Sequence, residues 1–278
     1  MRNSYAPGSK DSVRAVRATI RHFRPDLVLY SCGLGRSFQL FGFSAWPHTV
    51  FRPLLLIKDT DTMNNPSSHQ SFDERAASWD ENPLRLDLAR AVARAITQNI
   101  PLNPSMDCLE IGSGTGLVTM ELARQVGSIL ATDSSQGMLA ELEKKKTAAG
   151  ARNITTLLLD LTRNPAALGE SRFHLIYSGM TLHHIEDTLA ILRTCRDLLL
   201  PLGRIAFADL AKEDGSFHPD MTGVWHLGFD PGELAELATR AGFGEISFSE
   251  AHVIRKKVEG GKTKDYPVFL FTARNPVA

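Results

Sequence analysis

Short runs of apolar residues alternate along most of the chain with longer segments in which apolar residues recur every three or four positions. The short runs predict buried strands, and the longer segments predict amphipathic helices. With 278 residues, the chain is long enough for one α/β domain and an appendage. The predicted strands are residues 106–111, 129–133, 155–161, 173–178, 204–210, 245–253 and 266–272, and predicted helices begin near residues 83, 117, 135, 187 and 231.

A glycine-rich turn connects the first predicted strand to its helix. Glu110 lies between two apolar residues, and glycines follow at positions 112, 114 and 116 before the helical segment 117–123. Glycine lets the backbone approach a ligand closely, and the free N–H groups at the helix start can face that ligand. A dinucleotide-binding G-x-G-x-x-G pattern is not matched, because Leu117 stands where its third glycine belongs.

The E-x-G-x-G-x-G spacing from Glu110 to Gly116 resembles the first motif of class I S-adenosylmethionine (SAM) methyltransferases. Phe72–Asp80 reads F-D-x-x-A-x-x-W-D. It resembles the segment that leads into a cofactor-covering helix in the ubiquinone- and menaquinone-type small-molecule branch of that family. The resemblance covers residues 72–274 and implies SAM as the cofactor. It also implies a Rossmann-like, seven-stranded, mostly parallel sheet in the order 3-2-1-4-5-7-6, with strand seven antiparallel and helices on both faces.

Two aspartates at predicted strand ends complete the cofactor site that the resemblance implies. Asp133 is expected to accept hydrogen bonds from both ribose hydroxyls, which is compatible with a second role as a helix cap. Asp160 is expected to accept from the adenine amino group, with Leu161 against the ring; the alternative is a solvated turn aspartate. Trp79 either covers SAM or anchors a helix to the core. The residues expected to contact SAM are Glu110, Gly112, Ser113, Gly114, Gly116, Asp133, Ser134, Met138, Asp160, Leu161, Ser178 and Trp79, and no metal site is predicted.

The acceptor site is expected beyond the carboxyl ends of the strands, where the two halves of the sheet meet. Residues 178–183 follow the fourth strand there, and the polar loop 213–226 follows the fifth. The family's N/D-P-P-Y/F tetrapeptide is missing, which disfavours amide and exocyclic base nitrogens as acceptors. A general base is needed only if the acceptor keeps its proton at neutral pH. The adjacent histidines at positions 183 and 184 follow a strand end, and the alternative is that such a pair has a structural role. The candidate proton acceptors, expected to face the methyl group together with Trp79, are His183, His218 and His226.

Composition narrows the range of partners. The 31 basic and 31 acidic residues give zero net charge, and no basic stripe is present to hold a nucleic acid, so a small-molecule acceptor is expected. No run of 18 apolar residues predicts a membrane span. The cysteines at positions 32, 108 and 195 are scattered and form no C-x-x-C motif, which indicates free thiols in a reducing compartment such as the cytoplasm.

Residues 1–62 differ from the rest of the chain, because up to Lys58 their basic residues far outnumber the two acidic ones, Asp11 and Asp26. We interpret them as a poorly ordered extension upstream of a natural start at Met63. The alternative is an Arg-rich organelle transit peptide. The methyltransferase domain is expected to span residues 63–278.

The sequence thus predicts an enzyme that transfers the methyl group of SAM to an O, C or N nucleophile of a small molecule by in-line displacement. Two alternatives stay open. One is a catalytically silent SAM-binding scaffold or regulatory subunit. The other is a nucleotide-dependent oxidoreductase, which Leu117 disfavours.

Overall fold

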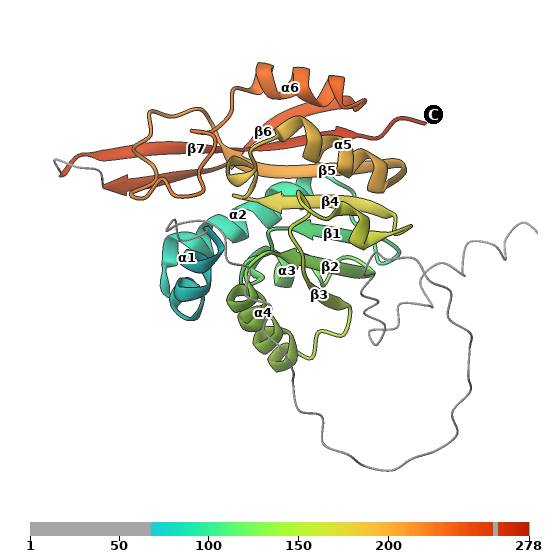
Figure 1. The fold of residues 1–278 in the computed structure, drawn as a ribbon, viewed down its shortest axis with the longest axis horizontal. Coiled ribbons are helices and arrows are strands. Elements are labelled where there is room, and N and C mark those ends of the chain that lie inside the picture. The colour runs from blue at the N-terminus through green and yellow to red at the C-terminus, as the bar shows by residue number, and fades with distance from the viewer. Residues whose placement is uncertain (1–67, 258–260, 278) are drawn as a thin grey trace, which may run out of the picture. The chain divides into compact units, whose positions relative to one another are not determined.

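The computed structural model of the protein describes residues 68–257 and 261–277, so the predicted extension 1–62 lies outside the described residues (Figure 1). None of the helices in these two ranges is long and apolar enough to cross a lipid bilayer. The helices are α1 (Ser68–Arg75), α2 (Pro83–Asn99), α3 (Leu117–Leu122), α4 (Gln136–Ala149), α5 (Thr188–Leu198) and α6 (Pro231–Arg240), and the 3-10 helices are η1 (Ala76–Glu81), η2 (Pro165–Leu168) and η3 (Leu182–His184).

One seven-stranded sheet forms the centre of the described residues, and its order β3-β2-β1-β4-β5-β7-β6 confirms the predicted topology. The first five strands are parallel, and β7 pairs antiparallel with both β5 and β6. The order reverses between β1 and β4, so the switch point expected for ligand binding lies at their carboxyl ends. The strands are β1 (Asp107–Ile111), β2 (Ser128–Asp133), β3 (Ile154–Leu158), β4 (Phe173–Gly179), β5 (Leu199–Leu210), β6 (Gly244–Lys257) and β7 (Thr263–Arg274).

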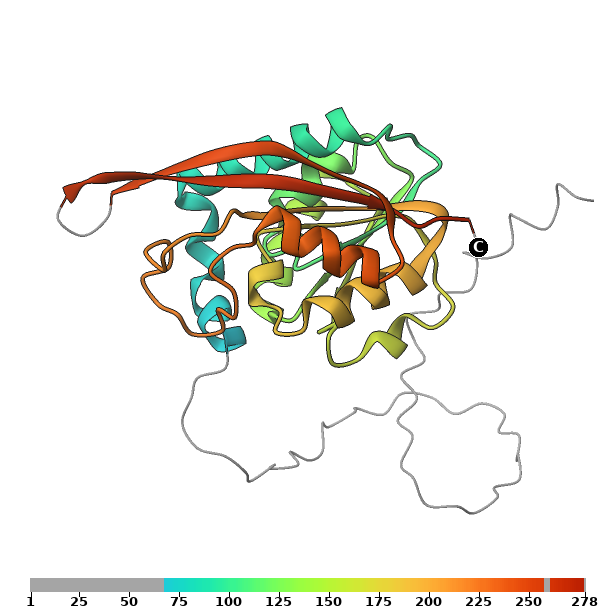
Figure 2. The same ribbon diagram turned by 90° about the horizontal axis from the view of Figure 1, so that it is seen from above.

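Successive residues of β1 belong to two different cores, because side chains alternate between the faces of a strand. Cys108 packs in the core that contains Val92 of α2, whereas Leu109 packs in the core that contains Leu192 of α5 and Leu234 of α6. Figure 2 shows this arrangement from above, with α2 in teal on one face of the sheet and α5 and α6 in yellow and orange on the other. Both faces of the central strands are therefore buried, which explains their continuous apolar runs.

Helices α2, α4, α5 and α6 begin at side-chain caps. Asn82 accepts a hydrogen bond from Leu84 N and Asp230 accepts from Gly232 N and Glu233 N, with a proline at the first position of each helix. Ser135 caps α4 and Asp187 caps α5 in the same way. These caps fix where each helix starts, and so they fix the loops that lie at the carboxyl edge of the sheet.

The third strand is shorter than predicted. β3 ends at Leu158, and Asp160 lies in the turn that follows. Leu159 N still donates to Asp133 O at 2.8 Å, but Asp160 Oδ1 then accepts from Thr162 N at 3.0 Å and draws the chain into a tight turn. An aspartate that bonds the backbone two residues ahead competes with strand pairing, which the apolar pattern alone did not reveal.

Candidate active site

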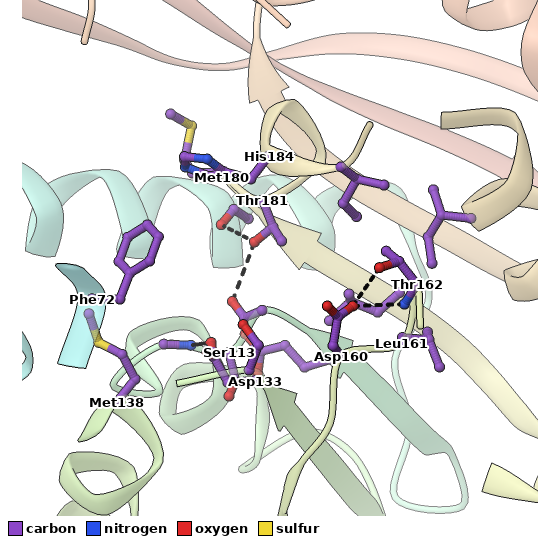
Figure 3. A pocket seen from close by; sticks show the side chains of 18 of the residues that line it. Phe72, Ser113, Asp133, Met138, Asp160, Leu161, Thr162, Met180, Thr181 and His184 are labelled. Carbon is purple, nitrogen blue, oxygen red and sulfur yellow. Dashed lines mark hydrogen bonds between the residues drawn. The ribbon is translucent and has the colours of Figure 1, made fainter. Parts of the chain in front are cut away.

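A cavity of about 590 Å³ lies at the carboxyl ends of β1, β2 and β4. In Figure 3, Phe72 and Met138 lie on one side of the view, Asp160 and Leu161 lie on the other, and Asp133 lies between them. The walls of the cavity combine apolar side chains with a few carboxylates and backbone groups, which is typical of sites that bind small organic ligands.

The glycine turn forms the floor of the cavity. Gly112 (φ 67°) and Gly114 (φ 54°) adopt left-handed conformations and line the cavity. A Cβ on Gly112 would lie 2.4 Å from Thr181 Oγ1, whereas a Cβ on Gly114 would meet no atom within 4 Å. Between them, the buried Ser113 Oγ has no hydrogen-bond partner. The turn therefore presents open space and one unsatisfied hydroxyl to a ligand.

Gly116 has a different role from the other glycines of the turn. It is the N-cap of α3 with φ 80°, and a Cβ there would lie 2.2 Å from Leu142 Cδ1. It is not among the residues that line the cavity. We therefore assign to Gly116 the close packing of α3 against α4 instead of the cofactor contact expected from the motif.

Asp133 at the end of β2 faces the cavity and links the two neighbouring loops. Its Oδ2 accepts from Gly114 N at 2.7 Å and its Oδ1 accepts from Ser135 N at 2.8 Å. Ser134 and Met138 line the cavity beside it. The carboxylate is thus held in place at the cavity by two backbone N–H groups.

Asp160 and Leu161 lie on the opposite side of the cavity from Phe72, as Figure 3 shows. Asp160 Oδ1 accepts from Thr162 N and, at 2.6 Å, from Thr162 Oγ1, and its Oδ2 lies 3.3 Å from Arg163 Nε. Leu161 is buried against the core. Asp133 and Asp160 therefore make the same local hydrogen bond, in which a side-chain oxygen accepts from the backbone N–H two residues ahead.

Glu110 lines the cavity from within β1 and is only 2% exposed. Its Oε2 accepts from Thr119 Oγ1 at 2.5 Å and from Tyr177 OH at 2.9 Å. Burial raises the pKa of Glu110 to about 8, although these two hydrogen bonds act in the opposite direction. Ser178, also expected at the site, is buried, donates to Ile111 O at 2.8 Å and does not line the cavity.

Residues 72–81 of α1 and η1, called the cap below, contribute Phe72 and Trp79 to the cavity wall. The two rings meet edge to face at 5.8 Å. The guanidinium of Arg85 lies 3.7 Å from the centre of the Trp79 ring, and Arg85 Nη1 donates to Trp79 O at 3.0 Å. Trp79 therefore lines the cavity and is bound to Arg85 near the start of α2, and the covering of SAM by its ring stays a prediction.

The three histidines expected to face the acceptor do not line the cavity. His183 is 1% exposed, and its Nδ1 lies 2.7 Å from Oδ1 of the fully buried Asp209. His226 Nε2 contacts Ile185 O at 2.9 Å. The ring of His218 lies 4.9 Å from that of His183, and burial, with the neighbouring His183 and His184, lowers the pKa of His218 to about 4. The buried contact with Asp209 favours the structural alternative for His183.

His184 is the histidine that reaches the cavity, and the sequence reasoning did not single it out. Its Nδ1 lies 2.7 Å from Gly223 O, so Nδ1 carries the proton and donates, and Nε2 keeps a lone pair. Burial and the neighbouring His183 lower the pKa of His184 to about 4. Thr181 and Met180, which follow β4, also line the cavity near it, and Met180 has a left-handed φ of 59°.

The loop that follows β5 is held against η3 by its backbone. Trp225 N and His226 N donate to His183 O at 3.0 and 3.2 Å. These bonds place the Trp225 side chain at the cavity, although it is 57% exposed. No group of three or more His, Cys, Asp and Glu side chains within residues 68–257 and 261–277 is arranged to hold a metal ion.

Comparison with known proteins places this geometry among methyltransferases. A family model described as a methyltransferase domain matches residues 108–203, from β1 to the start of β5. A ubiquinone biosynthesis O-methyltransferase of Cereibacter sphaeroides is 27% identical over 215 residues, and the alignment covers 66% of this chain and 84% of that relative.

Solved structures share the fold at low sequence identity. Phosphoethanolamine N-methyltransferase 2 of Haemonchus contortus, in complex with S-adenosyl-L-methionine, is 14% identical with a TM-score of 0.54 and covers 74% of this chain and 60% of that one. The cyclase SpnF is 16% identical with a TM-score of 0.58 and covers 77% of this chain and 97% of that one. The fold therefore also serves a cyclase, so the chemistry has to be argued from the site.

Proposed function

Because the chain is a class I SAM-dependent methyltransferase, we propose that it methylates a hydroxyl oxygen of a small and largely apolar acceptor. The O-methyltransferase relative supports oxygen as the methylated atom. The single observation that carries the proposal is that the glycine turn, an apolar wall and one neutral histidine line the same cavity.

The residues of the cavity fit SAM. Gly114 leaves open space where any side chain would project, and the buried Ser113 Oγ lacks a partner that a polar ligand would supply. Asp133 is proposed to hold the ribose hydroxyls, and Asp160 with Leu161 the adenine. For the methionyl end, Arg85 is a cation at the cavity wall and Glu110 is a carboxyl group at its floor. When bound, SAM supplies a methyl group on a positively charged sulfur, which is activated toward displacement by a nucleophile.

The acceptor is proposed to occupy the part of the cavity between α2 and the loop that follows β5. Leu88 and Val92 of α2, Met180 after β4 and Trp225 line the cavity with apolar surface. Such surface favours an acceptor with an apolar body, and it excludes water from the reacting groups. The exposed Trp225 indole would cover the part of the acceptor nearest to solvent.

His184 is the proposed proton acceptor. With Nδ1 donating to Gly223 O, the lone pair of Nε2 is available to take the proton of a hydroxyl group. Its lowered pKa keeps the ring neutral throughout the physiological range, which is the form able to accept a proton. The buried pair of His183 and Asp209 lies behind it, with the rings of His183 and His184 4.2 Å apart, and supports its position.

The proposal is tested by titration calorimetry with SAM, followed by a turnover assay that measures release of S-adenosylhomocysteine (SAH). Acceptors are offered in matched pairs, each hydroxylated compound beside its O-methyl ether. We expect SAM binding, and SAH release with hydroxylated members only. Binding without turnover of any acceptor would favour the SAM-binding scaffold or a cyclase-like activity, and turnover of the ethers would exclude oxygen as the methylated atom.

A further inference from the structure

Two carboxylates attach the cap to the Rossmann-like domain. Asp73 Oδ1 accepts from Ser135 Oγ at 2.5 Å and from Gly137 N at 2.7 Å, so it binds the first turn of α4. A Cβ on Gly137 would lie 3.1 Å from the Asp73 backbone, which shows how closely the two segments approach. Carboxylates bind well at helix N-termini, because free N–H groups point outward there. Asp73 therefore fixes one end of the cap.

Asp80 attaches the other end of the cap to the glycine turn. Its Oδ1 accepts from Thr115 Oγ1 at 2.6 Å, and its Oδ2 pairs with Lys145 Nζ of α4. Thr115 is 1% exposed, lies between Gly114 and Gly116, and lines the cavity. One carboxylate thus joins the cap, the turn that forms the cavity floor, and α4.

The cap also reaches the acceptor side of the cavity. Phe72 packs edge to face against the His184 ring at 5.5 Å, and Trp79 lines the cavity near Arg85. The cap therefore extends from the glycine turn to the proposed proton acceptor. A ligand that occupies the cavity beneath Phe72 and Trp79 is enclosed by the cap on this side.

We propose that Asp80 is a latch whose hydrogen bond to Thr115 couples the glycine turn to closure of the cap, and so sets the rate at which SAM and SAH leave. This inference rests on the proposed function, because it takes SAM and SAH as the ligands of the cavity. Asp73 is the fixed attachment, since its carboxylate accepts from Ser135 Oγ and Gly137 N at the N-terminus of α4. Asp80 is the releasable one, since its side chain is 36% exposed and its uncharged partner belongs to the ligand-binding turn. Both aspartates are positioning residues, because neither lines the cavity.

The test measures how fast SAH dissociates from the full chain, by displacement of labelled SAH with excess unlabelled SAM. Thr115→Val removes the hydroxyl while keeping the shape of the side chain, and Thr115→Ser keeps the hydroxyl. We expect Thr115→Val to release SAH about tenfold faster, the size expected for one lost hydrogen bond to a charged group. Asp80→Ala should release SAH at least as fast as Thr115→Val, because it also removes the ion pair with Lys145. Thr115→Ser is expected to stay within about twofold of the wild type. Asp87→Ala, which removes an exposed carboxylate on α2, is the matched control and should leave the rate unchanged.

Two further measurements separate a latch from a structural role. The double variant Thr115→Val with Asp80→Ala should release SAH no faster than Asp80→Ala alone, because both changes remove the same bond. Hydrogen exchange of residues 72–81 should slow when SAH binds the wild type, and much less in Thr115→Val. Unchanged release from folded Thr115→Val and Asp80→Ala, equal effects of Thr115→Ser and Thr115→Val, or additive effects in the double variant would overturn the latch. Failure of the wild type to bind SAH would instead overturn the proposed function.

Discussion

The cofactor end and the acceptor end of the cavity are built in different ways. At the cofactor end, Asp133 is the last residue of β2, Asp160 lies in the turn after β3, and each accepts from the backbone N–H two residues ahead. At the acceptor end, Leu88, His184 and Trp225 come from a helix, a 3-10 turn and a long loop, which only the tertiary structure brings together. The first end is determined by local geometry at strand ends, whereas the second depends on how separate elements pack. Substitutions should therefore affect SAM binding at one end and acceptor turnover at the other.

The largest effect is expected from Gly114→Val. A valine at φ 54° is strained, and its side chain would project into the open space of the turn, so SAM binding should be abolished in a folded protein. Gly150→Val is the matched control, because Gly150 has φ 62°, also has no atom within 4 Å of its Cβ position, and caps the far end of α4. Calorimetry with SAM on both variants measures the affinity. Retained binding in Gly114→Val would show that SAM binds away from the glycine turn.

Asp133→Ala should weaken SAM binding by about 2–4 kcal/mol, because two ribose hydroxyls would lose a charged acceptor. The change also frees Gly114 N and Ser135 N from their common partner, so the glycine turn loses support. Calorimetry and a melting curve separate the two effects. A folded variant that binds SAM within about threefold of the wild type would show that the ribose lies elsewhere.

His184→Asn should lower kcat by about 100-fold with the hydroxylated acceptor and leave the SAM affinity unchanged. The neutral ring accepts the proton, so the His184-dependent rate rises with pH through a pKa of about 4 and is flat across the physiological range. His183→Ala should lower stability, because it removes the imidazole that lies 2.7 Å from the buried carboxylate of Asp209. Loss of turnover in His226→Asn, together with full activity of His184→Asn, would instead restore the loop histidine as the base.

Some residues of the cavity could be identified from the sequence, and others could not. The glycine turn, Asp133 and Asp160 could be placed because each follows a buried strand, and parallel strand ends meet at one edge. Gly116 and Ser178 fit the same motif and strand, yet they contact Leu142 and Ile111 O instead of the cavity. A sequence motif gives the position of a residue along the turn, but the packing of α3 and β4 decides which atoms face the ligand.

The choice between the two adjacent histidines could not be made from the sequence. They lie in η3 with their rings 4.2 Å apart, yet His183 Nδ1 is bound to Asp209, whereas His184 lines the cavity. The loop 213–226 was expected to bring its histidines to the site, but its backbone bonds to His183 O direct Trp225 there instead. Asp209 could not be identified as the buried partner, because its contact with His183 joins residues 26 positions apart and depends on how η3 packs against β5.

A smaller, pH-dependent effect is expected at Glu110. Its raised pKa means that the folded protein without ligand holds a proton between about pH 4.3, the ordinary value for glutamate, and about pH 8. The unfolded chain has lost that proton, so this contribution to stability is present at low pH and is lost as the pH rises through about 8. A bound sulfonium favours the ionised carboxylate, so SAM binding should release a proton and tighten as the pH rises toward 8.

Glu110→Gln isolates this contribution, because glutamine resembles the protonated acid but cannot ionise. Melting curves should show that the wild type loses stability relative to Glu110→Gln as the pH rises from about 6 to 9. Calorimetry of SAM binding in buffers of different ionisation enthalpy should detect proton release in the wild type and none in the variant. Equal pH dependence of both proteins would place the titrating group elsewhere in the cavity.

The smallest effect is expected at Trp225, and it tests the acceptor end directly. The indole is 57% exposed, lines the cavity and contacts no other aromatic ring within the described part of the chain. A bound acceptor that packs on it would bury apolar and aromatic surface worth about 0.5–1.5 kcal/mol. Trp225→Ala should therefore raise the acceptor KM by roughly two- to tenfold, while kcat and the SAM affinity change little.

Leu227→Ala is the matched control for Trp225, because Leu227 belongs to the same loop, is 39% exposed and does not line the cavity. Its acceptor KM should equal that of the wild type. If both variants raised KM equally, the loop as a whole and not the indole would govern acceptor binding. If neither variant raised KM, the acceptor would bind away from Trp225. The acceptor end of the cavity would then not include this loop.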